Sequence, residues 1–339
     1  MKHVNVALFV VHKGCPHTCT FCNQRSITGE TRELTPSDVR AAAETALASL
    51  DSETAAGGEI AFFGGSFTMV DREYMISLLE AACEYVGKGL FAGIRISTRP
   101  DGIDPVICGI LKKYGVTAVE LGAQSLNDRV LEMNERGHSA KQVEDACRML
   151  REYGFEYGLQ MMTGLYGSDD EDCIETARRI IELNPATVRI YPTVVLENTK
   201  LFALMQGGLF TPKGVDETVE LCAKLIPMFR KAGIRIIRLG LHSGGGVEKE
   251  YAGGAYHPAL RELCEGRIYR DAALRELEKL DKGRYELLVG KGCVSKMTGQ
   301  KKCNLDYLRS AGYICTVLQS EDIEEYEVKV RYKDVSEIN

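Results

Sequence analysis

The chain has 339 residues, of which 45% are hydrophobic and 27% are charged, and its formal net charge is −6. This composition is typical of a globular protein. The acidic balance excludes a wholly basic nucleic-acid binder but leaves room for a local basic patch. No apolar run reaches the length of about 20 residues that a membrane-spanning helix needs. We therefore expect a cytoplasmic protein with no membrane partner.

Short runs rich in valine and isoleucine alternate with longer amphipathic stretches up to about residue 240. We predict strands at Val4–Val11, Glu59–Phe63, Gly93–Thr98, Ala118–Gly122, Glu156–Met162, Thr187–Val194 and Ile234–Leu239. We predict helices at Ser37–Leu50, Glu73–Val86, Pro105–Tyr114, Ala140–Tyr153, Glu171–Leu183 and Val215–Ala232. Repeated β/α units indicate an α/β fold with a parallel sheet. About six such units favour a partial TIM-type barrel, with an open doubly wound sheet as the alternative.

A glycine-rich break at 242–246 ends the repeating region, so we place a barrel domain at 1–245 and a small α+β domain at 246–339. In the second domain we predict helices at Pro258–Cys264, Asp271–Leu280 and Asn304–Ala311. Its predicted strands are Tyr285–Val289, Tyr313–Gln319 and Tyr326–Tyr332.

Polar and glycine-rich strings follow the predicted strands of the barrel. They read GGSF at 64–67, STRPD at 97–101, GAQS at 122–125, QMMTGLYG at 160–167 and YPT at 191–193. The carboxyl ends of parallel barrel strands meet at one mouth, where barrel active sites are built. The strings therefore predict one shared ligand site.

The twelve cysteines divide into a cluster and a scattered set. Disulfides are not expected in this compartment. The scattered cysteines are most simply small buried apolar residues; they are Cys83, Cys108, Cys147, Cys173, Cys222, Cys264, Cys293, Cys303 and Cys315. Only Cys15, Cys19 and Cys22 are closely spaced, directly behind the first predicted strand.

Three clustered cysteines suggest a zinc site, a thiol redox pair or an iron–sulfur cluster. Structural zinc takes four ligands, and His12 or His17 would have to complete such a site. A thioredoxin-like CxxC pair leaves Cys15 unexplained. An iron–sulfur cubane normally takes four cysteines, so three leave one iron open to a substrate or cofactor. The cluster is favoured, and zinc remains open on these residues alone.

The string CPHTCTFC at 15–22 resembles the CxxxCxxC signature of the radical S-adenosylmethionine (radical SAM) superfamily. The resemblance implies a [4Fe–4S] cluster held by Cys15, Cys19 and Cys22, with SAM bound to the fourth iron. It also implies that reductive cleavage of SAM yields a 5′-deoxyadenosyl radical, which abstracts hydrogen from a substrate.

The longer strings resemble the radical SAM core of the Elongator catalytic subunit and its bacterial relatives that lack the acetyltransferase domain. They are GGSF, STRPD, VELGAQS at 119–125, RGHS at 136–139 and IYPTVVLENT at 190–199. The resemblance runs in the same order over roughly residues 1–245.

The same resemblance implies roles for individual residues around SAM. The expected contacts are Phe21 and Gly164 near the adenine, Gly64 and Gly65 in close backbone approach, Ser66 through its hydroxyl, Gln124 and Ser125 at the ribose, and Arg136 at the carboxylate. The candidate catalytic residues are Arg99, which is expected to contact either SAM or the substrate, and Tyr191, which is expected to face either the adenine or the substrate radical. Each also has a plainer alternative, such as a tight turn, a strand-end cap, a surface arginine or a packed aromatic ring.

We accordingly expect a radical SAM enzyme, with a tRNA nucleoside as the expected substrate. A small-molecule substrate, or a non-catalytic cluster-binding or redox-sensing protein, are the alternatives. An external electron donor of the flavodoxin or ferredoxin type is implied. A stretch of cations could contact tRNA or another RNA, or could be a solvated face; it comprises Lys282, Arg284, Lys291, Lys296, Lys301 and Lys302.

Overall fold

The computed structural model describes residues 4–10, 15, 18–23, 32–87, 90–241 and 247–332. The chain forms two compact units, one of Met1–Gly214 with Met228–Tyr256 and the other of Val215–Pro227 with His257–Asn339. The division falls inside helix α10 (Val215–Lys231), at Pro227. No helix in the described ranges is long and apolar enough to cross a membrane.

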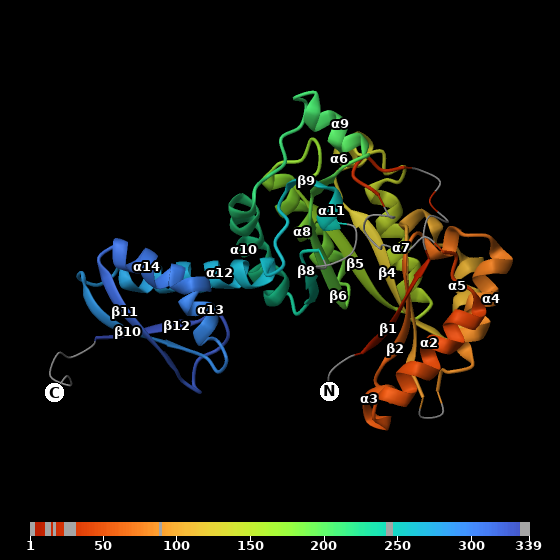
Figure 1. Ribbon diagram of the computed structural model, residues 1–339, viewed down its shortest axis with the longest axis horizontal. Helices are drawn as coiled ribbons and strands as arrows, with labels where there is room; N and C mark the ends of the chain where they lie inside the picture. The colour runs from red at the N-terminus through yellow and green to blue at the C-terminus, as the bar shows by residue number, and fades with distance from the viewer. Residues whose placement is uncertain are drawn as a thin grey trace. The chain divides into compact units, whose positions relative to one another are not determined.

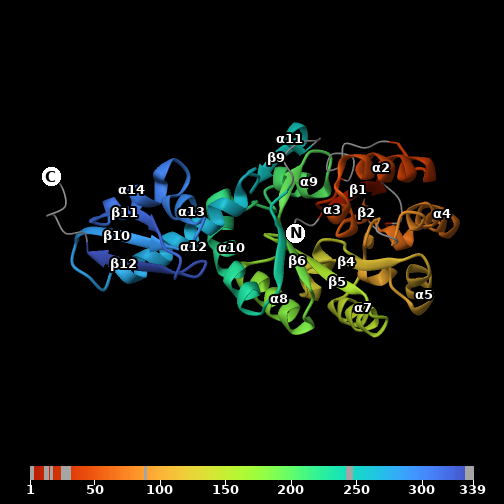
Figure 2. The ribbon, with the colours of Figure 1, turned by 90° about the horizontal axis from the view of Figure 1, so that it is seen from below.

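The first unit is built on a seven-stranded sheet in the order β1-β2-β3-β4-β5-β6-β8, in which every neighbouring pair is parallel. The sheet curls into a half-barrel (Figures 1 and 2). This confirms the predicted partial barrel and excludes the open doubly wound alternative. The strands are β1 (Asn5–Val10), β2 (Glu59–Gly64), β3 (Gly93–Thr98), β4 (Val116–Gln124), β5 (Glu156–Thr163), β6 (Thr187–Pro192) and β8 (Arg235–Leu239).

Helices alternate with these strands and pack on the outer face of the sheet (Figure 1). Local signals explain where they begin: Thr35 caps the first helix in a capping box with Asp38, and Pro36 occupies its first turn. The helices are α2 (Pro36–Ser49), α3 (Ser52–Ala56), α4 (Arg72–Cys83), α5 (Pro105–Lys113), α6 (Asp128–Met133), α7 (Ala140–Glu152), α8 (Asp170–Leu183), α9 (Lys200–Gln206) and α11 (Val247–Glu250). A short antiparallel ribbon of β7 (Val194–Leu196) and β9 (Tyr251–Gly254) completes the unit.

The second unit has a three-stranded sheet in the order β11-β10-β12, with helices packed against it. Strand β10 (Gly283–Val289) is parallel to β11 (Tyr313–Gln319) and antiparallel to β12 (Val328–Tyr332). The helices are α12 (Leu260–Leu277), α13 (Val294–Thr298) and α14 (Cys303–Ser310). Tyr269, Leu287 and Met297 belong to its core. The α+β class predicted for this region is confirmed.

One prediction in this unit is wrong. The two helices predicted at Pro258–Cys264 and Asp271–Leu280 are a single helix, α12. Gly266 lies inside it and is buried rather than ending it. A Cβ at this position would approach the Lys296 carbonyl oxygen to 3.3 Å, so the glycine serves close packing of α12 against α13.

Candidate active site at the carboxyl edge of the half-barrel

A layer of ion pairs crosses one face of the curled sheet. Arg95 on β3 donates to Glu59 on β2 at 2.6 Å and to Glu120 on β4 at 3.0 Å. Glu120 also accepts from Arg189 on β6 at 2.8 Å, across the intervening strand β5. Glu156 at the start of β5 adds a contact with Arg95 at 3.1 Å. Except for Glu156, these side chains are nearly or fully buried.

The geometry of Arg189 identifies this face as the concave one. Its guanidinium lies 5.4 Å from the ring centroid of Phe63, on β2. Three strands separate β2 from β6 in the sheet, so the two side chains meet only because the sheet curls around them. The concave side of the half-barrel, called the chamber below, is therefore lined by paired charges.

The three clustered cysteines lie at the carboxyl edge of the strands, behind β1. The exposed Cys15 has its Sγ 3.2 Å from the hydroxyl of Ser66, which follows β2. The buried Cys19 accepts a hydrogen bond from Arg136 at 3.1 Å. Burial, together with the charges of the neighbouring Cys19 and Cys15, raises the pKa of the Cys22 thiol to about 12. The three thiols are thus close enough to interact electrostatically.

The three thiols suit an iron–sulfur cubane, in which each thiolate binds a different iron. Among the described residues, no group of three histidine, cysteine, aspartate or glutamate side chains is placed to hold a single metal ion. His12 and His17, the ligands considered for zinc, lie outside the described residues.

Two arginines lie behind the cysteine loop in a fixed arrangement. Arg136 donates to the Gly122 carbonyl at 2.7 Å as well as to Cys19. Arg99 forms a bidentate pair with Asp101, at 2.9 Å for each bond, and also donates to the Arg136 carbonyl. Both arginines are buried. The structure therefore brings together Cys19, Arg136 and Arg99, which sequence reasoning had placed behind three different strands.

Several buried polar atoms at this edge have no hydrogen-bond partner within the described part of the chain. A buried group left unpaired costs about 1–3 kcal/mol, so such a set indicates a polar ligand. The atoms are Ser97 Oγ, Arg99 Nη1, Gln124 Oε1, Arg136 Nε and Thr193 Oγ1. Four of these atoms lie at or just beyond the carboxyl ends of β3, β4 and β6. The fifth, Arg136 Nε, lies in the loop before α7.

The remaining predicted SAM contacts divide between the edge and the loops. Gln124 ends β4 in the left-handed region, at φ 63°, whereas the Ser125 hydroxyl accepts from the Asn127 amide at 3.1 Å and lies near Thr176. Phe21 is half-buried beside Cys22.

The glycines at the edge also have structural reasons of their own. Gly64 has φ +106°, and a Cβ there would meet the Val10 carbonyl oxygen at 2.8 Å, so β1 and β2 themselves require this glycine. The amide of Gly65 donates to the same oxygen at 2.8 Å. Gly164 turns the chain after β5 at φ +71°.

Tyr191 lies on the concave face of β6, one residue before the carboxyl end of the strand. Burial raises its pKa, while the adjacent Arg189 guanidinium opposes that shift by charge and hydrogen bonding. Tyr191 is therefore a neutral phenol among cations, in the chamber rather than beside the cysteines.

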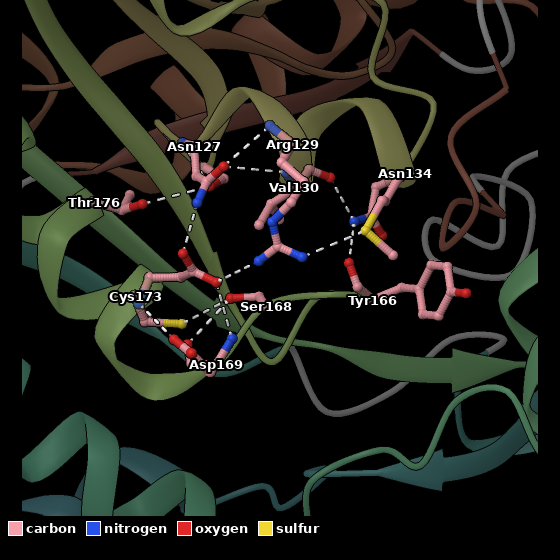
Figure 3. Close-up of polar contacts among 12 residues, drawn as sticks. Asn127, Arg129, Val130, Asn134, Tyr166, Ser168, Asp169, Cys173 and Thr176 are labelled. Carbon is pink, nitrogen blue, oxygen red and sulfur yellow. Dashed lines mark hydrogen bonds and ion pairs between the residues drawn. The ribbon is translucent and has the colours of Figure 1, made fainter.

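The cysteine loop is anchored by one buried asparagine that the sequence gave no reason to single out. The Asn134 carbonyl accepts from the Thr20 amide at 3.2 Å, and its Oδ1 accepts from the Thr20 hydroxyl at 3.0 Å. Its Nδ2 donates to the carbonyls of Val130 at 2.8 Å and Tyr166 at 2.9 Å. Figure 3 shows Asn134 between α6 and the loop after β5. Asn134 thus joins the cysteine loop to the turn that begins at Gly164.

A second set of contacts holds that turn in place. Asp172 on α8 accepts from Asn127 at 2.6 Å and from Arg129 at 3.2 Å. Asp169 caps the same helix in a capping box. The loops that follow β4 and β5 are therefore fixed to each other.

We expect Asn134→Ala to lower the free energy of unfolding by about 2–4 kcal/mol, because it removes the side-chain bonds to the Tyr166 and Val130 carbonyls and to the Thr20 hydroxyl. Thr20→Val removes a single bond of this set and should cost about 1 kcal/mol. Urea unfolding of the metal-free chain measures both. Equal effects of the two variants would contradict a hub role for Asn134.

His138 lines a cavity of about 810 Å³ beside the cysteine loop. Burial, together with the charges of Arg136 and Arg99, lowers the pKa of its imidazole to about 3. Its Nε2 lies 3.3 Å from the Ala123 carbonyl oxygen. At neutral pH the ring is uncharged, so it adds no cation to the edge.

The unfolded chain therefore binds a proton at His138 that the folded chain does not, below the ordinary histidine pKa of 6.5. Above pH 6.5 we expect His138 to leave the free energy of unfolding unchanged. Below pH 6.5 it should lower that free energy by up to about 1.4 kcal/mol per pH unit. Urea unfolding between about pH 5 and 7.5 should show a shallower slope for His138→Gln. A slope identical to that of the wild type would contradict the assignment.

The sequence does contain a signal for the ion pairs inside the half-barrel, although we did not use it to predict them. Arg95, Glu120 and Arg189 each interrupt an otherwise apolar strand. In a parallel sheet covered by helices on one face, such a residue must face the other side and find a charged partner there.

The cations of the predicted basic stretch belong to several elements of the second unit. Lys282 and Arg284 lie at the amino end of β10, whereas Lys291 follows its carboxyl end. Lys296 is paired with Glu265 at 2.9 Å and with Glu325 at 3.2 Å. Its charge is therefore neutralised locally.

Fold and site together define an α/β half-barrel protein that gathers three cysteines and unpaired polar groups at the carboxyl edge of its sheet. The family model of the radical SAM superfamily matches residues 9–180, and that of the radical SAM C-terminal domain matches residues 185–270. The chain belongs to the radical SAM superfamily. Membership implies a [4Fe–4S] cluster and SAM as cofactors.

Similar curated proteins confirm the predicted resemblance to the Elongator type. The chain is 32% identical over 180 residues to the tRNA uridine(34) acetyltransferase of Dehalococcoides mccartyi, covering 45% of this chain and 38% of that protein. It is 28% identical over 199 residues to Elongator complex protein 3 of Homo sapiens, covering 55% and 35%. The chain thus spans little more than a third of the length of these relatives.

Solved structures agree on the fold. The archaeal Elp3 of Methanocaldococcus infernus superposes with a TM-score of 0.64 at 22% identity, covering 79% of this chain and 63% of that one. SuiB of Streptococcus suis superposes with a TM-score of 0.51 at 12% identity, covering 94% and 58%.

Proposed function

We propose that this protein is a radical SAM enzyme whose cluster is held by Cys15, Cys19 and Cys22 and whose substrate is a tRNA nucleoside. The observation that carries the proposal is the placement of three interacting thiols at the carboxyl edge of a half-barrel, beside buried polar atoms without partners. When bound, the cluster supplies the electron that cleaves SAM to methionine and a hydrogen-abstracting 5′-deoxyadenosyl radical.

The residues of the edge have complementary tasks in this proposal. Ser66 and Arg136 hold Cys15 and Cys19 through hydrogen bonds. The remaining Nε of Arg136 is the donor for the SAM carboxylate, because guanidinium binds carboxylates strongly. Gln124 supplies an unpaired oxygen for a ribose hydroxyl. The proposed adenine contacts, Phe21 and the Gly164 turn, lie on segments that Asn134 joins.

The substrate side is proposed from the chamber. Arg99 and Tyr191 remain the candidates for substrate contact, and the curled sheet separates that chamber from bulk water on the helix-covered side. A tRNA substrate is supported by the names of the curated relatives. We propose that electrons come from a flavodoxin- or ferredoxin-type donor and that the protein works in the cytoplasm.

The experiment is anaerobic reconstitution with iron and sulfide, followed by reduction with dithionite. The reconstituted protein should show cluster absorbance and convert SAM to 5′-deoxyadenosine. Mass spectrometry of tRNA nucleosides from cells with and without the gene then identifies the modified base. A protein that binds no cluster and cleaves no SAM would refute the proposal, and unchanged nucleosides would refute the tRNA substrate.

A further inference from the structure

The charges inside the half-barrel are unevenly distributed between its two sides. On the β2–β4 side, Glu59 and Glu120 both contact Arg95. Towards β6, Arg189 shares Glu120 with Arg95, at 2.8 Å and 3.4 Å. Carboxylates are thus concentrated at the middle of the sheet, and the last strand, β8, contributes a further arginine.

That residue, Arg238, faces the chamber. It is the register partner of Arg189 in the parallel pair β6–β8, and residues paired in this way project on the same side of a sheet. It also interacts electrostatically with both Arg189 and Tyr191. Two arginines therefore stand side by side at the β6–β8 end, where like charges repel.

Arg238 has no carboxylate partner in the described part of the chain. Its Nε donates to the Gly240 carbonyl at 2.8 Å and its Nη2 to the Leu241 carbonyl at 2.5 Å. The five residues after Leu241 read HSGGG and carry no carboxylate. The other two arginines of the chamber, Arg95 and Arg189, each pair with a carboxylate. Among the described residues, Arg238 is therefore the chamber cation without a carboxylate partner.

The location suits a substrate rather than SAM. The residues proposed for SAM belong to β2, β4, β5 and the loops around them, whereas Arg238 is on the far edge strand. A guanidinium that is fixed by two carbonyls is pre-organised to present its free edge to an anion, and phosphate matches its planar fork.

We propose that the β6–β8 side of the half-barrel interior binds a phosphate of the substrate, with Arg238 as its counter-ion. The inference rests on the proposed function for its choice of RNA as the source of that phosphate. It assigns Arg238 as a specificity-determining residue. The Arg238 guanidinium favours an anionic substrate bound beside Tyr191 over a neutral one.

The test is fluorescence anisotropy of labelled unfractionated tRNA with the reconstituted protein, at several salt concentrations. We expect Arg238→Gln to weaken binding about tenfold to a hundredfold and to lower the slope of log K against log salt by about one. Arg235→Gln removes the same charge from an exposed position on the same strand and is the matched control. It should bind tRNA as the wild type does. Equal binding by both glutamine variants would overturn the proposal.

A second variant separates recognition from folding. Arg238→Lys keeps the charge but loses the fork that holds the two carbonyls, so it should retain more binding than Arg238→Gln. If Arg238→Lys loses binding and thermal stability to the same extent as Arg238→Gln, the residue only tethers the loop and the proposal fails. Competition by uridine 5′-monophosphate that depends on Arg238 would assign the phosphate to a free nucleotide rather than to the RNA chain.

The two proposals fail in different ways. Absence of cluster and of SAM cleavage in the wild type refutes the enzyme, whatever tRNA binding shows. A wild-type enzyme that cleaves SAM but binds tRNA independently of Arg238 refutes only the phosphate site.

Discussion

Replacement of Cys15 by alanine is expected to abolish cluster binding and SAM cleavage while leaving the folded chain nearly as stable as before. Cys15 is exposed and contacts Ser66 through its thiol, so its removal sacrifices little packing. A cubane that loses one of three protein ligands has two irons without a thiolate, and its retention should collapse. Absorbance after anaerobic reconstitution and 5′-deoxyadenosine formation are the two readouts.

Cys303→Ala is the matched control, because Cys303 is also an exposed free cysteine but lies in the second unit. It should assemble the cluster and cleave SAM at wild-type levels. Full cluster content in Cys15→Ala would show that Cys15 is not a ligand. Loss of cluster in Cys303→Ala as well would show that the assay reports general damage.

The second large effect is on stability. Arg95→Met is expected to lower the free energy of unfolding by about 3–5 kcal/mol, because the buried Glu59 loses its contact with Arg95 and the buried Glu120 loses one of its two arginines and keeps Arg189. The cost comes from the loss of this partner by the buried carboxylates, since replacing a whole buried ion pair by apolar groups is often neutral. Urea unfolding of the metal-free protein measures it.

Arg178→Ala is the control for this prediction. Arg178 also bridges two glutamates, Glu171 and Glu175, but all three are exposed on α8. Surface pairs of this kind contribute at most about 1 kcal/mol. If the two variants were equally stable, the interior network would have no special role in holding the half-barrel together.

Much of the fold was predictable because its signals are local. Strand β3 was predicted with its observed ends, and the others within a few residues, since buried parallel strands are continuous apolar runs. The helices were found from their amphipathic period and caps. Short elements were missed, because too few residues carry a periodic signal; they are α3, α6, α9, α11, α13, β7 and β9.

The error at α12 has the same origin. Residues between the two predicted helices, among them Gly266, continue α12, and Gly266 packs closely against α13 despite the low helix propensity of glycine. Tertiary packing overrode a local signal at a position where a side chain would not fit.

By itself the sequence determined the repeating α/β architecture, the family signature in the cysteine loop and the edge at which the site would form. These follow from periodicity, spacing and the rule that parallel strands end together. Only the tertiary structure decided that Asn134 anchors the cysteine loop, that Arg136 contacts Cys19, and that Arg238 has no carboxylate partner among the described residues. These contacts form because the curled sheet brings together side chains from strands that are far apart in the sequence. A pattern read along the sequence does not show which of those side chains meet.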